Sequence, residues 1–125
     1  MTSTADLPIT FSAVAVDCPD PAALAEFYSA LTGLAIAGRD EGWWQLESAP
    51  GVPALAFQLS ADHQPPTWPD GERPQQLHLD FDVADLDAGE ARALALGARK
   101  HDHQPGETFR VFLDPAGHPF CLCLD

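Results

Sequence analysis

The strongest constraint on this chain is an internal repeat with an offset of 65 residues. Sliding the sequence by 65 positions places Asp85 on Asp20 and His78 on Ala13. In both copies a strand is followed by an aspartate in a helix N-cap position, an alanine-rich helix and a glycine that ends the helix. Each copy then continues through several short strands. This order predicts an α+β fold built from two βαβββ modules.

The first copy opens with a strand of small and β-branched residues at about 10–18, and Pro21 to Gly33 delimit its helix. The second opens with alternating apolar and polar residues at 77–83, and its helix runs from Asp85 to about Leu96. The other expected strands are at about 34–38, 43–47, 54–60, 98–103, 109–113 and 119–124. We expect a single domain over 1–125, with module one at about 8–60, a Pro-rich linker at 61–74 and module two at about 75–125.

The net charge and the number of cysteines limit which partners and which cellular compartment we expect. The 125 residues include 19 Asp and Glu against 6 Lys and Arg, a net charge of −13, so the protein is strongly acidic. This charge disfavours nucleic acid and anionic membranes, which bind clusters of Lys and Arg. No run of 18 apolar residues is present, and residues 1–6 lack the basic start of a signal peptide. With three cysteines, an odd number, a reducing cytoplasm is the expected compartment.

Four motifs occur together over residues 8–124. They are Phe27-Tyr28 with Leu31-Thr-Gly-Leu34 in the first helix, the runs Pro65–Pro69 and Pro74–Asp80, His103-Gln-Pro-Gly106, and the turn Asp114-Pro-Ala-Gly-His-Pro-Phe-Cys121. In this order they resemble the vicinal oxygen chelate superfamily, and its glyoxalase-like branch of glyoxalase, bleomycin resistance and dioxygenase proteins in particular. The resemblance implies half-open, curved mixed sheets around a cleft, helices on the outer face, and a homodimer.

Superfamily enzymes hold a divalent metal with His, Gln or Glu side chains from the first and last strands of each module. The resemblance places these positions on Ala13, on Leu55 or Gln58, on His78 and on Cys121. Alternation along 54–60 favours Gln58, because Leu55 belongs to the apolar face of that strand. Ala13 cannot bind a metal and Cys121 replaces a carboxylate, so we expect no native metal and no cofactor. A soft zinc site at His78 and Cys121 is the alternative.

Alternation along 77–83 turns His78, Asp80 and Asp82 toward the cleft. Because an imidazole can accept and release a proton near neutral pH, His78 is the expected catalytic acid/base. The alternative is a structural histidine bonded to Asp80. The residues expected to bind ligand are Gln58, Trp43, Trp44, Asp80 and Cys121.

Three aromatic or thiol positions leave alternatives open. Trp43 and Trp44 are adjacent on a strand, so one faces the cleft as a stacking wall and the other faces the core. Trp68 is either a lid over the cleft or a plug that packs the linker onto the domain, and we favour the plug. Cys121 beside His78 is an alternative nucleophile, although buried cysteines are usually inert.

These expectations leave three functions. The first is a glyoxalase-like small-molecule-binding protein of the bleomycin-resistance type, which requires an apolar cleft with a few polar groups. The second is a metal-independent enzyme of the lyase or isomerase type with His78 as acid/base. The third, a metal-dependent lyase, isomerase or extradiol-type dioxygenase, is disfavoured by Ala13 and Cys121. The expected partner is a small organic ligand, neutral or cationic because of the net charge, with no nucleic acid and no membrane.

Overall fold

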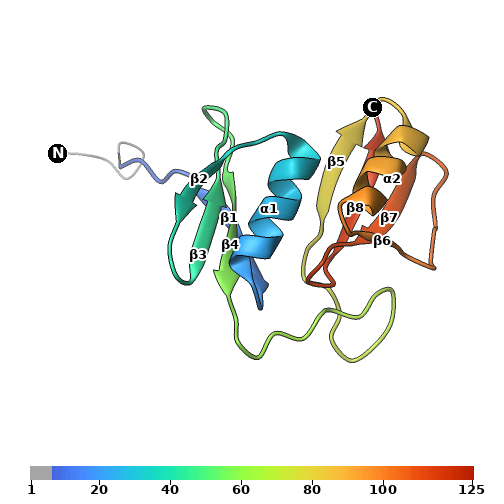
Figure 1. Ribbon diagram of the computed structural model, residues 1–125, viewed down its shortest axis with the longest axis horizontal. Helices are drawn as coiled ribbons and strands as arrows, with labels where there is room; N and C mark the ends of the chain where they lie inside the picture. The colour runs from blue at the N-terminus through green and yellow to red at the C-terminus, as the bar shows by residue number, and fades with distance from the viewer. Residues whose placement is uncertain (1–6) are drawn as a thin grey trace.

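The computed structural model of the protein describes residues 7–125, and it contains the same unit twice (Figure 1). The predicted α+β class with two βαβββ modules is confirmed. Module one comprises β1 (Ala13–Cys18), α1 (Pro21–Thr32), β2 (Ile36–Arg39), β3 (Trp43–Leu46) and β4 (Ala54–Leu59). Module two comprises β5 (Leu79–Val83), α2 (Leu86–Ala95), β6 (Arg99–Lys100), β7 (Phe109–Leu113) and β8 (Pro119–Leu124).

Each module forms its own four-stranded mixed sheet, and the two sheets have the same topology. Their strand orders are β1-β4-β3-β2 and β5-β8-β7-β6. In each sheet the first and last strands of the module pair in parallel, and the other pairs are antiparallel. The register also repeats, because Ala15 pairs with Ala56 and, 65 residues later, Asp80 pairs with Cys121. Equivalent positions of the two modules can therefore be compared directly.

Both helices begin at the predicted aspartates. Asp20 Oδ1 accepts a hydrogen bond from the backbone of Ala23 at 3.2 Å, and Asp85 Oδ1 accepts two, from Asp87 at 2.9 Å and from Ala88 at 3.2 Å. These bonds satisfy amides that have no partner inside the helix. The predicted stop at Gly33 is also confirmed: this residue has a left-handed φ of 82°, and its amide donates to Ser29 O.

Helix α1 lies between the two sheets and joins their cores (Figure 1). The Tyr28 ring stacks on Phe57 of β4 at a centroid distance of 5.6 Å and contacts Phe81 of β5 at 5.8 Å. Its neighbour Phe27 packs edge-on against Phe120 of β8, also at 5.8 Å. Because one helix supplies aromatic side chains to both sheets, the modules share one hydrophobic core.

Two predicted strand boundaries near the site need correction. β5 begins at Leu79, so His78 precedes the strand instead of lying within it. The strand expected at 98–103 is reduced to Arg99–Lys100, because Gln104 takes over the hydrogen bonding of the following residues. Its Nε2 donates to the carbonyls of His101 and Val111 at 2.8 Å each, and its Oε1 accepts from the Val111 amide at 2.9 Å.

Over residues 7–125, neither helix is long and apolar enough to cross a membrane. The expectation about a signal peptide rests on residues 1–6, which lie outside the part of the chain that the structure describes.

Candidate functional site

Side-chain alternation in module two separates a core face from an open face, as predicted. Phe120 and Leu122 of β8 belong to the hydrophobic core, and Leu79 and Phe81 of β5 pack against it. The intervening side chains therefore point to the other face of the sheet. They are Asp80 and Asp82 of β5, and Cys121 and Cys123 of β8.

A cavity of about 220 Å³ lies on this open face. Neighbouring strands β7 and β8 supply its apolar wall, with Val111 directly opposite Cys121 in the register. The chain between β4 and β5 folds over the same cavity and adds three side chains. The lining residues are Trp68, Gln75, His78, Pro105, Phe109, Val111, Pro119 and Cys121.

Three polar groups converge at the edge of this cavity. His78 Nε2 lies 3.1 Å from Asp80 Oδ1, and a donor atom from each of His78, Asp80 and Cys121 falls within 4.8 Å of the other two. The His78 and Asp80 side chains are 41% and 56% exposed, whereas Cys121 is 7% exposed. The imidazole is thus open to an incoming ligand on one side and oriented by a carboxylate on the other, which is how a proton-transferring histidine is held.

The Cys121 thiol is not set up as a nucleophile. Burial, together with the nearby Asp80 carboxylate, raises the pKa of Cys121 to about 12. Nucleophilic attack requires the thiolate, which this environment disfavours. Burial also raises the pKa of Cys123 on the same strand. The chemistry of the cluster therefore falls to His78 and Asp80, with Cys121 as a weak hydrogen-bonding group.

The four metal positions implied by the superfamily do not come together as one set of donors. By the repeated register, the counterparts of His78, Asp80 and Cys121 in module one are three alanines: Ala13, Ala15 and Ala56. Module one therefore contributes no donor at these positions. The three donors of module two, one each of N, O and S, fit a zinc ion with an open coordination position better than a hard cation that requires several oxygens.

The open face of module one carries a different set of side chains. Trp43 pairs with Gln58 across β3 and β4, and its Nε1 donates to Gln45 Oε1 at 3.1 Å. Trp44 lies on the opposite face, packs against the core, and has the Arg39 guanidinium 5.4 Å from its ring centroid. Trp43 is therefore the tryptophan on the open face of its sheet, and Trp44 is the one on the core face. Neither Trp43 nor Gln58 lines the cavity beside His78.

The structure brings further residues to the cavity. Trp68 lines it and also packs against His101 and His103, so the same side chain forms part of the cavity wall and holds the linker against module two. Phe109 and Val111 could have been predicted, because they alternate along the expected strand at 109–113. Gln75 carries no such signal: it precedes the strand, and only the folding of the linker places it in the cavity.

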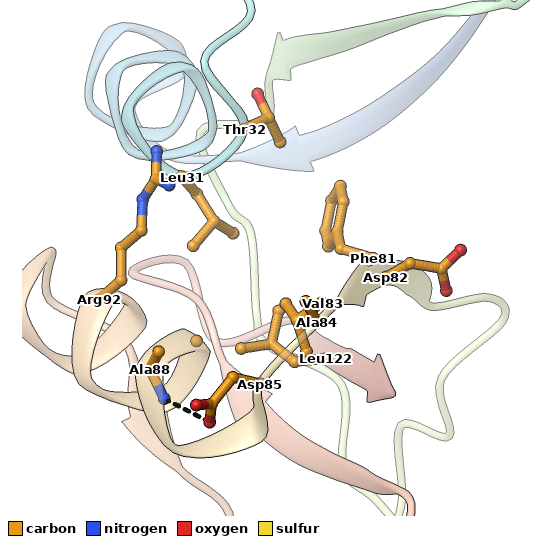
Figure 2. A pocket seen from close by; sticks show the side chains of 11 residues that line it. Leu31, Thr32, Phe81, Asp82, Val83, Ala84, Asp85, Ala88, Arg92 and Leu122 are labelled. Atoms are coloured by element: carbon orange, nitrogen blue, oxygen red, sulfur yellow. Dashed lines mark hydrogen bonds between the residues drawn. The ribbon is translucent and has the colours of Figure 1, made fainter. Parts of the chain in front are cut away.

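A larger hollow of about 560 Å³ lies elsewhere, between the C-terminal end of α1 and the N-terminal end of α2 (Figure 2). Two of its polar side chains, Asp85 and Arg92, have structural partners. Asp85 caps α2, as the dashed line in Figure 2 shows, and Arg92 donates to Ala30 O of α1 at 2.7 Å. Leu31, Phe81 and other apolar side chains form the rest of its wall. This hollow thus lacks the converging groups that mark the cavity beside His78.

Comparisons with known proteins agree with this architecture. A family model described as a glyoxalase-like domain matches residues 13–123. A glyoxalase/bleomycin resistance protein/dioxygenase family enzyme from Burkholderia phytofirmans superposes with a TM-score of 0.71 at 19% identity, over 93% of this chain and 98% of the other. A comparison with curated proteins finds no match.

Two further solved structures share the fold. A glyoxalase/bleomycin resistance protein from Albidiferax ferrireducens has a TM-score of 0.63 at 22% identity, over 92% of this chain and 98% of that protein. A bleomycin resistance determinant encoded on the transposon Tn5 has a TM-score of 0.61 at 18% identity, over 91% and 96% of the two chains. At these identities the likeness concerns the fold and does not identify a ligand or a reaction.

Proposed function

The chain belongs to the glyoxalase-like domain family, and on that basis we propose that it binds a small organic molecule in the cavity of module two, where His78 acts as acid/base if the ligand is turned over. The reaction would be a metal-independent one of the lyase or isomerase type. The single observation that carries the proposal is the position of His78, which lines an apolar cavity while its Nε2 lies 3.1 Å from the Asp80 carboxylate.

The cavity suits a compact ligand. Its volume of about 220 Å³ is below the range of about 300–1,000 Å³ that is typical of sites for drug-sized molecules. Phe109 and Val111 offer apolar contacts, whereas His78 offers a polar group at the edge. The net charge of −13 and the Asp80 carboxylate favour a neutral or cationic molecule over an anion.

A ligand screen followed by substitution of His78 tests this function. Thermal-shift measurements with planar metabolites and antibiotics would first identify compounds that stabilise the protein, since a ligand that binds the native state raises its stability. His78→Ala should then abolish turnover of any compound that is a substrate while leaving its binding largely intact. Unchanged turnover and unchanged binding in this variant would exclude His78 as a functional residue.

A second candidate is a metal-dependent activity, and the His78, Asp80 and Cys121 cluster favours zinc over other ions. Elemental analysis of the purified protein measures its metal content directly. Stoichiometric zinc in the wild type that is lost in Cys121→Ser would support this candidate over the metal-independent one. A metal content below one tenth of an equivalent, unchanged by dialysis against zinc, would exclude it.

A homodimer is part of the same proposal. Several large apolar side chains are exposed in the chain before β1 and in nearby loops: Leu7, Ile9, Phe11, Val52 and Leu77, all between 55% and 98% exposed. A hollow of about 510 Å³ with mostly apolar walls lies beside Val52. Large exposed apolar side chains of this kind are typical of a protein interface, and a second copy of the chain presents the same side chains in return. The three cysteines, all free, support a reducing compartment such as the cytoplasm.

A further inference from the structure

The chain between β4 and β5 does more than connect the modules. This connecting segment, residues 60–78, supplies three of the eight side chains that line the cavity of module two: Trp68, Gln75 and His78. His78 is already part of the proposed site. Trp68 and Gln75 are additional, and both depend on how the segment is folded.

Trp68 lies in a loop that is closed on itself. The Thr67 amide donates to Arg73 O at 2.6 Å, and the Arg73 amide donates to Thr67 Oγ1 at 3.0 Å. Arg73 Nε also donates to Pro65 O at 3.0 Å. These three bonds on either side of Trp68 restrict the loop, so that little conformational entropy remains to be lost when a ligand contacts the indole ring.

The Trp68 ring is also held from the side of module two. His101 and His103 pack against it at centroid distances of 5.0 and 5.2 Å, in tilted edge-on arrangements. The His103 amide donates to His101 Nδ1 at 2.9 Å. Of the three bonds of the Gln104 side-chain amide, one goes to His101 O and two go to Val111, and these two tie the stretch to β7. The indole is therefore a fixed part of the cavity wall.

Gln75 presents an unused hydrogen-bond acceptor. Its Oε1 is buried and, among the described residues, has no hydrogen-bond partner. It is the one buried side-chain polar atom in residues 7–125 with this property. Because leaving such an atom unpaired destabilises the native state, it requires an explanation. Since Gln75 lines the cavity, a rotation of its side-chain amide toward the cavity would give Oε1 a partner on a bound ligand.

We propose that the connecting segment determines which ligand binds in the cavity of module two: Trp68 stacks on a planar ring, and Gln75 Oε1 accepts a hydrogen bond from an N–H or O–H group of that ligand. The ligand class is thus a neutral or cationic planar compound of one or two rings that carries such a donor. This inference rests on the proposed function, because it assigns the recognition groups of the same cavity.

Pairs of probes that differ in the donor test the inference. Indole and benzofuran have the same size and shape, as do 2-naphthol and 2-fluoronaphthalene, but only the first member of each pair can donate a hydrogen bond. Binding to the full-length, ¹⁵N-labelled protein would be measured by NMR titration. The wild type should bind the donor member about three- to tenfold more tightly, the range expected for one hydrogen bond.

Four variants separate the two contacts. Gln75→Met keeps the volume without the acceptor and should bind both members of a pair equally. Trp68→Ala should weaken both members by about three- to tenfold, whereas Trp68→Phe should retain most of the affinity because it preserves stacking. Leu94→Ala, at an exposed position on α2, is the control and should bind like the wild type. A donor preference that survives Gln75→Met, or wild-type affinity in Trp68→Ala, would overturn the assignment.

A measurement without ligand checks the premise about Gln75. If its acceptor is unpaired, Gln75→Met should raise the thermal midpoint by about 3–5 °C, whereas Gln76→Met, at the exposed neighbour, should leave it unchanged. A lower midpoint for Gln75→Met would show that Oε1 is paired and would refute the inference.

The failure of the inference can be told apart from that of the proposed function. If no probe binds but the wider screen finds a ligand whose binding is lost in Phe109→Ala, the inference is wrong and the function stands. If neither the probes nor the wider screen yields a ligand, both are wrong.

Discussion

Tyr28 and Asp114 are 86 positions apart in the chain, yet the Tyr28 hydroxyl donates to Asp114 Oδ2 at 2.6 Å. Tyr28 lies on α1 of module one, and Asp114 follows β7 of module two. Both are buried, with exposed fractions of 1% and 2%. Asp114 Oδ1 in turn accepts hydrogen bonds from the backbone amides of Ala116 and His118. One carboxylate therefore stabilises the turn before β8 and also links this turn to α1.

Removing the Tyr28 hydroxyl should therefore lower stability. In Tyr28→Phe the buried Asp114 Oδ2 loses its partner, and the free energy of unfolding should fall by about 1–3 kcal/mol. Chemical denaturation would measure the change. Ser29→Ala, which removes an exposed hydroxyl on the same helix that donates to Leu34 O, is the matched control and should cost less than about 1 kcal/mol. Equal losses for both variants would contradict the structural role of the buried pair.

The same bond predicts a pH dependence in the alkaline range. Burial, with the Asp114 carboxylate adding to it, raises the pKa of Tyr28 well above the usual value of 10.0 for a tyrosine. The stabilising contribution of the protonated phenol is complete below pH 10 and is lost as the pH rises toward the folded pKa, because the unfolded chain ionises first. The wild type should lose up to about 1.4 kcal/mol per pH unit relative to Tyr28→Phe above pH 10. A stability difference between the two proteins that stays constant to pH 11 would contradict this.

Cys121 should react slowly with alkylating reagents. A pKa of about 12, against the usual value of 9.0 for a cysteine, leaves about a thousandfold less thiolate than an unperturbed thiol at the same pH. Iodoacetamide labelling at pH 8, followed by peptide mass spectrometry, should therefore modify Cys121 only after denaturation. Rapid labelling of the native protein would instead support the nucleophile hypothesis for this residue.

At the scale of elements, the caps and alternating faces were predictable because they depend on local sequence. Asp20, Asp85 and Gly33 satisfy helix ends within a few residues, and strand parity follows from the pleat. The short strand β6 was not predictable from its own residues. There, Gln104 replaces strand pairing by bonds to β7, a tertiary effect that no local pattern contains.

Removing the cap of α1 should destabilise the whole protein, whereas removing the cap of α2 should destabilise mainly that helix. α1 has six buried residues, five of them in the shared core, whereas α2 has only Ala93. Asp20→Ala should lower the global free energy of unfolding by about 1 kcal/mol. Asp85→Ala should mainly speed hydrogen exchange within α2, since a loosely packed element opens locally. Exchange measured residue by residue would test this, and a uniform acceleration throughout the protein in Asp85→Ala would contradict it.

At the scale of the whole molecule, the repeat predicted two similar halves and one of the differences between them. The offset of 65 already placed Ala13 on His78, and the register adds that Ala15 and Ala56 occupy the places of Asp80 and Cys121. The candidate chemistry is therefore confined to module two. Gln75 and Trp68 reach the same cavity through the connecting segment, whose path depends on contacts with module two and is not encoded by any periodic pattern.

The exposed apolar surface leads to a prediction about assembly. Ile9 and Phe11, 98% and 69% exposed, should be covered by a second copy of the chain, because leaving such side chains in water forgoes about 25 cal/mol for each Å² of apolar area. Light scattering coupled to size-exclusion chromatography should give twice the chain mass of 13.4 kDa for the wild type. The double variant Ile9→Asp/Phe11→Asp should approach the monomer mass. Leu94→Asp, at a 43% exposed position on α2, should stay dimeric. A wild-type mass of one chain at high micromolar concentration would show that this surface serves another purpose.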